Sequence, residues 1–280
     1  GARAVANMLQ EKVNQQLLDV EVVEVGCDGA CYLAPRLTVT SSVQPGHARK
    51  YEQIRHYSLV TPTRARNIVK GLASGILPPE DPEPETFFKT QQRALLANLG
   101  QVDPGSIDDY ILRGGYEGLL KALYLTPEQV IQNVLDAGLR GRGGAYFPAA
   151  LKWRGARSHP NVTRYLVVNA EEGEPGVFKD RHIMEGEPHR LIEGLAVACY
   201  ATGAEHCFIY INAEAELSAR RMEHALKQAY ALRILGDNIL GTKTRLTVEI
   251  RRGAGGYVCG DETTLLNTIE GTRRVPRLRP

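Results

Sequence analysis

Residues 164–176, RYLVVNAEEGEPG, begin as a short apolar run and end in a turn rich in glycine, proline and carboxylates. The run is typical of a buried β-strand, and similar runs follow at 206–212 (HCFIYIN) and 246–253 (LTVEIRRG). Helical patterns at 189–203 and 216–232 separate the three runs. Strands and helices in alternation predict a mostly parallel sheet covered by helices, so we expect an α/β domain.

The composition is that of an ordinary globular protein. The chain has 280 residues, of which 43% are hydrophobic and 24% charged, and its formal net charge is +2. This charge gives no broad field for nucleic acid or a membrane surface, and the basic end RRVPRLRP (273–280) is interpreted as a solvated segment. There is no run of about 18 apolar residues and no signal-peptide pattern, so we expect a cytoplasmic protein, either free or peripheral to a membrane complex.

The amino-terminal part is interpreted as a separate small domain. DVEVVEVG (19–26) and RLTVTS (36–41) are predicted strands, and Thr61 and Pro62 are predicted to begin a helix. Prolines and acidic residues then predict a linker over 76–89. We therefore expect domains at 1–75 and 90–280.

A glycine-rich loop, GLRGRGGAYFPAALKW (138–153), follows a helical pattern. Its glycines let backbone N–H groups approach an anion, and two arginines and a lysine add positive charge. The loop is not a Rossmann fingerprint, because Tyr146 stands at the third glycine position and no strand precedes it. It has no P-loop pattern either. Taken alone, it is equally well interpreted as a solvated connector.

Two further loops carry carboxylates after strands. Three glutamates lie within 171–174, and GAGGYVCGDETTLLNTIEG (253–271) adds glycines, a tyrosine and the carboxylates Asp261 and Glu262. Ligands bind at strand ends of open α/β sheets, and carboxylates accept hydrogen bonds from ribose hydroxyls or a flavin ring N–H. A basic loop that binds phosphate, together with acidic loops that bind a ribose or a flavin ring, predicts a nucleotide-like cofactor. A solvated acidic turn is the alternative for 171–174 taken alone.

The three loops resemble the hallmark segments of the flavin-binding 51-kilodalton subunit of respiratory complex I. The same family includes diaphorase subunits of NAD(P)-reducing hydrogenases and formate dehydrogenases, and the resemblance covers roughly residues 90–280. It implies an FMN-dependent NAD(P)H dehydrogenase module that transfers hydride between a nicotinamide dinucleotide and FMN. Electrons would pass to iron–sulfur subunits of a multi-subunit oxidoreductase, with a small ferredoxin-like subunit among the partners. The alternative is a non-catalytic nucleotide-binding or scaffold subunit.

The resemblance also implies roles for individual positions. Phe147 matches an aromatic residue that stacks on the NADH adenine, and Glu174 matches a carboxylate near the nicotinamide. The family usually has Asp at 171, Glu at 261 and Gly at 146, so Tyr146 is the largest departure. No side chain is expected to act as a nucleophile, because the cofactors carry the chemistry. The cofactor-binding residues implied are Gly141, Arg142, Gly143, Gly144, Phe147, Lys152, Asn169, Glu171, Glu172, Glu174, Tyr257, Gly260, Asp261 and Glu262.

Cys27 and Cys31 resemble the second cysteine pair of a thioredoxin-like [2Fe-2S] domain, which implies that residues 1–75 are a partial domain of that kind. Such a cluster needs four thiolates. Since the first pair would precede Gly1, we expect the two cysteines to bind metal only when that pair is supplied, and otherwise to be buried thiols. The family's [4Fe-4S] domain would follow Pro280, so we expect a fragment without either cluster.

Overall fold

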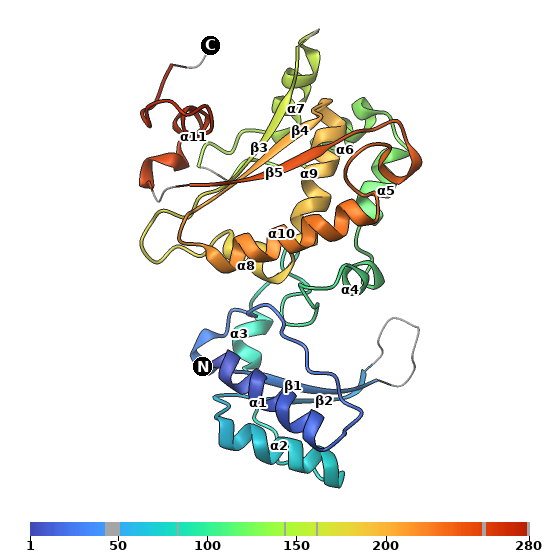
Figure 1. The fold of residues 1–280 in the computed structure, drawn as a ribbon. Helices are drawn as coiled ribbons and strands as arrows, with labels where there is room; N and C mark the ends of the chain where they lie inside the picture. The colour runs from blue at the N-terminus through green and yellow to red at the C-terminus, as the bar shows by residue number, and fades with distance from the viewer. Residues whose placement is uncertain (43–50, 83, 143, 161, 254–255, 279–280) are drawn as a thin grey trace. The chain divides into compact units, whose positions relative to one another are not determined.

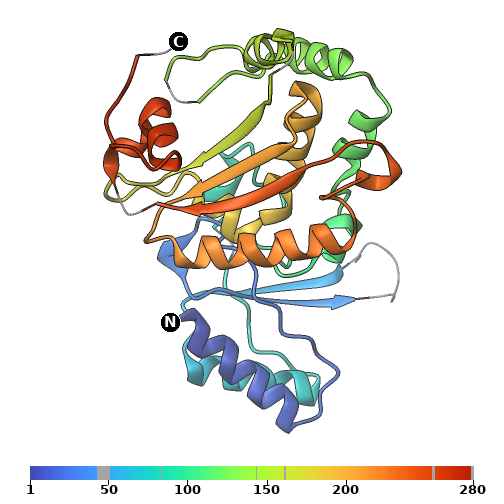
Figure 2. The ribbon, with the colours of Figure 1, turned by 45° about the horizontal axis from the view of Figure 1, so that its top comes forward.

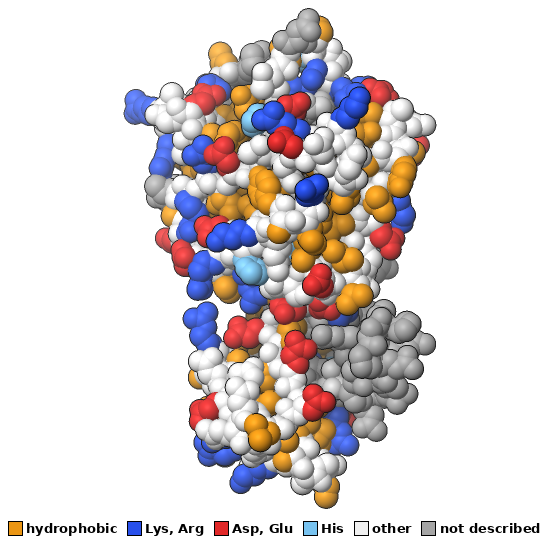
Figure 3. All heavy atoms as spheres, turned by 45° about the vertical axis from the view of Figure 1, so that its right-hand side comes forward, with side chains coloured by type: hydrophobic (Ala, Val, Ile, Leu, Met, Phe, Trp, Pro, Cys, Tyr) orange, Lys and Arg blue, Asp and Glu red, His pale blue; other side chains and the backbone are white. Residues whose placement is uncertain are grey.

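The computed structural model describes residues 1–42, 51–82, 84–142, 144–160, 162–253 and 256–278. The chain divides into two compact units, Gly1–Asp103 and Pro104–Pro280 (Figure 1). On the face shown in Figure 3, acidic and basic side chains are interspersed in both units, in keeping with the small net charge. Among the described residues, no helix has the length and apolar character that crossing a membrane requires.

The first unit packs two helices against an antiparallel hairpin. Helices α1 (Ala2–Gln15) and α2 (Pro62–Ser74) share a core with strands β1 (Leu37–Ser42) and β2 (Tyr51–Tyr57). Helix α2 begins as predicted, because the Thr61 hydroxyl accepts from the amide of Arg64 at 3.2 Å and Pro62 is its first residue. A short 3-10 helix, η1 (Cys31–Leu33), and helix α3 (Glu85–Lys89) complete the unit.

The prediction of a strand at 19–26 is wrong, since no helix or strand forms there. Val20 and Val22 do pack against the core, so the apolar pattern reports burial. A strand also needs a pairing partner, and β1 and β2 pair with each other in the described part of this sheet. The sequence analysis did not find β2, whose sequence YEQIRHY is mostly polar.

The proline-rich segment packs on the first unit. The Tyr57 hydroxyl donates to the carbonyl of Pro78 at 3.0 Å, and the amide of Ser58 donates to Asp81 at 2.7 Å. Helix α3 also begins within the stretch that was predicted to be a linker, directly after its last proline. The division at Asp103 is therefore downstream of that stretch. The thioredoxin-like character of residues 1–75 stays a prediction.

The second unit contains the predicted parallel sheet. Strands β3 (Tyr165–Ala170), β4 (His206–Ile211) and β5 (Thr247–Arg252) lie in the order β3-β4-β5. Helices α9 (Pro188–Thr202) and α10 (Glu216–Ala231) form the two crossovers and pack on the sheet (Figure 2). The short helix α8 (Arg181–Gly186) packs on both of these helices. The α/β fold class is confirmed.

Among the described residues of the second unit, four helices precede the sheet: α4 (Ile107–Leu112), α5 (Glu117–Leu123), α6 (Pro127–Asp136) and α7 (Ala149–Ser158). The apolar pattern of residues 106–123 resembles one helix, but the helix is broken between α4 and α5, where Gly114 and Tyr116 adopt φ of 82° and 63°. A carboxylate of α9 stabilises the break, because Glu193 accepts from the amides of Tyr116 and Leu119 at 3.0 and 3.1 Å. Helix α6 begins with a capping box formed by Thr126 and Gln129.

The carboxyl edge of the sheet brings distant parts of the chain together. Ala170 pairs with Ile211, and Ile211 pairs with Arg252, so the next residue of each strand leaves the sheet in the same row. These residues are Glu171, Asn212 and Gly253. The short 3-10 helix η2 (Ile239–Gly241) precedes β5 in the chain. After β5 come the 3-10 helix η3 (Tyr257–Gly260) and helix α11 (Glu262–Ile269). The two acidic loops predicted after strands, at 171–174 and 253–271, start from this edge.

Candidate functional site

Glu171 is a buried carboxylate at the carboxyl edge, with 3% of its surface exposed. Its Oε1 accepts a hydrogen bond from Nδ2 of Asn212, the first residue after β4. Its Oε2 is buried and has no hydrogen-bond partner among the described residues. Burial raises the pKa of Glu171, and the Asn212 amide opposes this rise. An unpaired buried acceptor is unfavourable by itself and points to a ligand that donates a hydrogen bond.

Tyr210 lies on β4, two rows before Glu171, where it pairs with Asn169, and it is also buried. Its hydroxyl makes no hydrogen bond of ordinary geometry within the described part of the chain. Burial raises the pKa of Tyr210, and the neighbouring Cys259 thiol raises it further. The ring lies against Gly253, where a Cβ would stand only 2.6 Å from the Tyr210 hydroxyl oxygen. The edge therefore holds a buried donor and a buried acceptor beside bare backbone.

The second and third predicted loops meet at this edge. Asn169, on β3, donates through Nδ2 to the carbonyl of Gly260 at 3.2 Å. Gly173 approaches Tyr257 so closely that a Cβ on Gly173 would lie 3.1 Å from the Tyr257 Cα. A side chain at position 173 would push the two loops apart, which explains why glycine occupies this position.

The glycine-rich loop is closed by its own backbone. The amide of Gly141 donates to the carbonyl of Phe147 at 2.9 Å, and Arg140 donates to the carbonyl of Tyr146 at 3.2 Å. Phe147 is 46% exposed, and Arg142 and Gly144 are also exposed. Gly143 lies outside the described residues. The loop follows α6 and no strand, as predicted.

Lys152 connects the first loop to the third. Its ammonium on α7 lies 3.7 Å from an Oε2 atom of Glu262, the first residue of α11. Both side chains are about half exposed, at 60% and 48%. The structure thus brings together residues from all three predicted loops, although each residue's role toward a cofactor stays a prediction.

Two of the predicted acidic residues also stabilise helix starts. Oε1 of Glu172 accepts from the amides of Asp180 and Arg181, the latter at 3.1 Å, where α8 begins. Asp261 is the N-cap of α11, and its Oδ2 accepts from the amide of Thr264 at 2.9 Å. The hydrogen bond from the Thr263 hydroxyl holds the pKa of Asp261 below its usual value. Glu174 is exposed.

Tyr146 adopts a left-handed backbone conformation, with φ of 51°. Such conformations favour glycine, because a Cβ crowds the following carbonyl. This gives a physical reason for the glycine that the resemblance implies at this position. The tyrosine side chain is 58% exposed at the mouth of the loop.

The sequence analysis missed Asn212, Tyr210 and Arg274. Arg274 places a guanidinium nitrogen 3.3 Å from the position of a Cβ on Gly256, and its charge opposes the rise in the pKa of Glu171. Tyr210 lies near the end of β4, and Asn212 is the first residue after it. The sequence of this segment had been interpreted only as a buried apolar strand. Asn212 had a detectable signal, because it follows the second strand as Glu171 follows the first.

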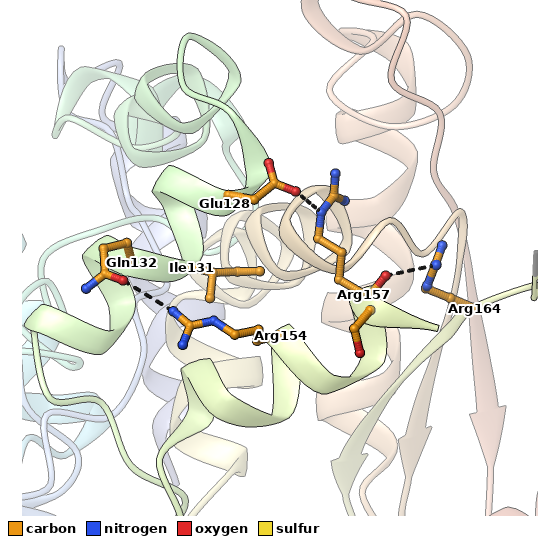
Figure 4. A pocket seen from close by; sticks show the side chains of 7 residues that line it. Glu128, Ile131, Gln132, Arg154, Arg157 and Arg164 are labelled. Atoms are coloured by element: carbon orange, nitrogen blue, oxygen red, sulfur yellow. Dashed lines mark hydrogen bonds and ion pairs between the residues drawn. The ribbon is translucent and has the colours of Figure 1, made fainter. Parts of the chain in front are cut away.

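A pocket of about 600 Å³ lies elsewhere in the second unit, between α6 and α7 (Figure 4). Its arginines have internal partners. Arg157 donates to Glu128 at 2.6 Å, Arg154 donates to Gln132 at 3.2 Å, and Arg164 donates to the carbonyl of Ala156 at 2.9 Å. These bonds join α6 to α7 and cap the end of α7. Since Arg164 precedes β3, the pocket is at the opposite end of that strand from Glu171, and we do not assign the cofactor to it.

Cys27 and Cys31 lie in the first unit with their sulfur atoms 3.6 Å apart. Both are exposed, so the alternative that they are buried thiols is wrong. Cys27 lies in the loop that leads into η1, and Cys31 is the first residue of η1. Burial of part of its surface raises the pKa of Cys27. Within the described residues, no group of three or more His, Cys, Asp and Glu side chains is placed to hold a metal ion.

The fold and the site define an α/β domain that presents loops for a ligand at the carboxyl edge of a parallel sheet. A family model described as the Nuo51 FMN-binding domain matches residues 134–280, and the chain belongs to this family. The match begins near the end of α6 and includes all three loops and the whole sheet. The resemblance inferred from the loops is confirmed.

Relatives of known function are similar to this chain. It is 48% identical over 187 residues to an NADH-quinone oxidoreductase subunit of Rhizobium meliloti (strain 1021), covering 66% of this chain and 44% of that protein. It is 44% identical over 195 residues to NADP-reducing hydrogenase subunit HndC of Solidesulfovibrio fructosivorans, covering 70% of this chain and 40% of that protein.

A solved structure of an NAD+-reducing [NiFe]-hydrogenase in its H2-reduced state aligns with a TM-score of 0.54 and 32% identity. The alignment covers 81% of this chain and 37% of the hydrogenase chain. This chain therefore spans less than half the length of each of these proteins.

Proposed function

We propose that this chain is the FMN- and NAD(P)H-binding part of a dehydrogenase module, which transfers hydride between a nicotinamide dinucleotide and FMN. The observation that carries the proposal is the pair of unpartnered buried atoms at the carboxyl edge, Oε2 of Glu171 and the hydroxyl of Tyr210. Membership of the FMN-binding family and the names of the relatives support it.

The residues at this edge fit a flavin. The flavin ring presents an N–H donor flanked by carbonyl acceptors, and the edge presents a buried acceptor on Glu171 and a buried donor on Tyr210. Gly253 and Gly173 leave bare backbone where a side chain would fill the space. The exposed amide of Gly144 supplies a donor for a phosphate, and Arg142 and Lys152 supply positive charge.

The chain contributes position and electrostatics to the proposed reaction. When bound, FMN supplies the chemistry of accepting a hydride and releasing electrons one at a time. Phe147 offers an exposed ring on which the adenine of the dinucleotide stacks, and the exposed Glu174 offers an acceptor to the carboxamide of the nicotinamide. Lys152 and Glu262 hold α7 and α11 at the mouth of the site. These contacts orient two rings against each other.

The surrounding assembly is part of the proposal. We infer that electrons leave toward iron–sulfur subunits of a larger oxidoreductase, including a small ferredoxin-like subunit. The names of two relatives, which are subunits of an NADH-quinone oxidoreductase and of an NADP-reducing hydrogenase, support a multi-subunit assembly. A cytoplasmic location, free or beside a membrane complex, belongs to the same proposal. Cys27 and Cys31 supply two thiolates, half of what a [2Fe-2S] cluster needs, so we assign no cluster to the described residues. A [4Fe-4S] cluster would belong to the longer protein.

The test is to add FMN to the purified protein, measure binding by quenching of flavin fluorescence, and add NADH or NADPH without oxygen. We expect saturable FMN binding and loss of the visible flavin absorbance on addition of a reduced dinucleotide. If dinucleotide binds but FMN does not, the chain is a non-catalytic nucleotide-binding subunit. If neither binds, either to this chain or to the longer protein, the proposed function is wrong.

A further inference from the structure

Asn212 is a buried side chain in the centre of the carboxyl edge, with 5% of its surface exposed. It follows β4, between Glu171 after β3 and Gly253 after β5. Its Oδ1 accepts from the amide of Glu214 at 2.8 Å. Its Nδ2 donates to Oε1 of Glu171 and lies 3.4 Å from the carbonyl oxygen of Glu172.

These partners fix the orientation of the Asn212 amide. A backbone N–H needs an acceptor, and a carboxylate and a carbonyl need a donor. Turning the amide over would place an N–H group against the amide of Glu214 and an oxygen against the carboxylate of Glu171. The Asn212 side chain is therefore locked from both sides, with its donor directed at Glu171.

The locked amide determines which oxygen of Glu171 remains available. Oε1 is bonded to Asn212, whereas Oε2 is buried without a partner among the described residues. An unconstrained carboxylate would rotate toward water or toward a donor, because an unpaired buried acceptor is costly. Asn212 prevents this rotation and keeps Oε2 in place before any ligand binds, which is preorganisation.

From this geometry we infer that Asn212 is a positioning residue of the FMN site, which holds Glu171 by Oε1 so that Oε2 accepts the ring N–H of the flavin. The inference rests on the proposed function. It adds a residue that touches Glu171 and not the cofactor. It also predicts that the binding site distinguishes a flavin that has the ring N–H from one in which a methyl group replaces that hydrogen.

The experiment compares FMN with 3-methyl-FMN, which lacks this N–H, by titration of wild type, Asn212→Asp and Glu171→Gln. Asn212→Asp keeps the acceptor for Glu214 but sets a second carboxylate against Glu171, and two carboxylates in contact resist joint ionisation. We expect wild type to prefer FMN by about tenfold or more, and both variants to lose most of this preference near neutral pH. In Asn212→Asp it should recover in acid, because a shared proton restores the hydrogen bond.

Gln228→Glu is the matched control, because it makes the same amide-to-carboxylate change at a half-buried side chain that contacts His189. We expect it to keep the wild-type preference at every pH. If Asn212→Asp behaves like Gln228→Glu, the inference is overturned. Should Asn212→Asp fail to fold, retention of the full preference by Glu171→Gln overturns it instead. If wild type binds neither flavin, the proposed function fails first; if it binds both equally, only the inference fails.

Discussion

The ammonium group of Lys152 and the carboxylate of Glu262 lie 3.7 Å apart and join the helix after the glycine-rich loop to the helix after the third loop. The pair is exposed, so its contribution to the free energy of unfolding is small, below about 1 kcal/mol. Its significance is that it places a lysine at the mouth of the proposed site. There an anionic ligand can replace the Glu262 carboxylate as the partner of the ammonium group, or bind the ammonium group together with it.

Lys152→Ala should weaken FMN binding about tenfold, because we propose that its positive charge binds the FMN phosphate. The free energy of unfolding should change by less than about 1 kcal/mol. Fluorescence titration and urea unfolding measure the two quantities. Lys121→Ala is the control, since Lys121 forms an exposed ion pair with Glu117 on α5. Equal dissociation constants for the two variants would show that Lys152 does not contact the flavin phosphate.

Tyr146→Gly should stabilise the protein by about 0.5–1 kcal/mol. A non-glycine residue pays about 1–2 kcal/mol in the left-handed region, and the extra entropy of glycine in the unfolded chain offsets part of this gain. Urea unfolding measures the change. Tyr124→Gly is the control, because Tyr124 is exposed but has φ of −83°. If both variants are destabilised alike, the left-handed conformation of Tyr146 carries no strain.

Gly253→Ala should destabilise the protein by about 1–3 kcal/mol, because the new Cβ would stand 2.6 Å from the hydroxyl oxygen of Tyr210. Tyr210→Phe should rescue part of this loss, since the ring atoms are farther away, at 2.9 and 3.1 Å. Gly155→Ala on α7 is the control, because no described atom beyond its chain neighbours and the backbone of its own helix lies within 4 Å of its Cβ position. An unaltered unfolding midpoint in Gly253→Ala would contradict the close packing at this edge.

Glu171→Gln should change how stability depends on pH in the protein without flavin. The pKa of Glu171 is raised in the folded state by burial, so the folded protein retains its proton to higher pH than the unfolded chain does. The contribution of Glu171 is therefore present at low pH and is lost as the pH rises through the folded pKa.

We accordingly expect the stability of wild type relative to Glu171→Gln to fall from about pH 4 to pH 8 in urea unfolding. Glu117→Gln, a change at an exposed carboxylate, is the control and should give a much smaller trend. A rise of wild type relative to Glu171→Gln over the same interval would mean that the folded state favours the charged form of Glu171.

The sheet could be predicted from the sequence because each strand is an apolar run separated by helices, and burial alone produces that pattern. The segment 19–26 has a similar apolar character, but its valines pack on the core without a strand partner. The sequence of one segment does not show whether another strand will pair with it. The break at Gly114 and Tyr116 was missed because it depends on Glu193, which is distant in the sequence.

The loops of the proposed site were predicted from the sequence, but Asn212 and Tyr210 at the carboxyl edge of the sheet were not. Glycines and acidic residues after strands are local signals, so the loops containing Lys152, Glu171 and Glu262 were identified. The row of Glu171, Asn212 and Gly253 depends on the register of three strands, which a sequence pattern does not specify. Tyr210 therefore became visible only in the folded chain, whereas the position of Asn212 directly after the second strand was a local signal that was overlooked.

The central claim is that the carboxyl edge of the sheet holds FMN, and hydrogen exchange of backbone amides with and without FMN tests it most directly. We expect FMN to slow exchange in the three segments that form the site, which are 139–152, 171–176 and 256–262. Segment 154–160, beside the arginine pocket, should exchange at an unchanged rate. Protection confined to 154–160, or to the first unit, with no change at the three loops would contradict the account.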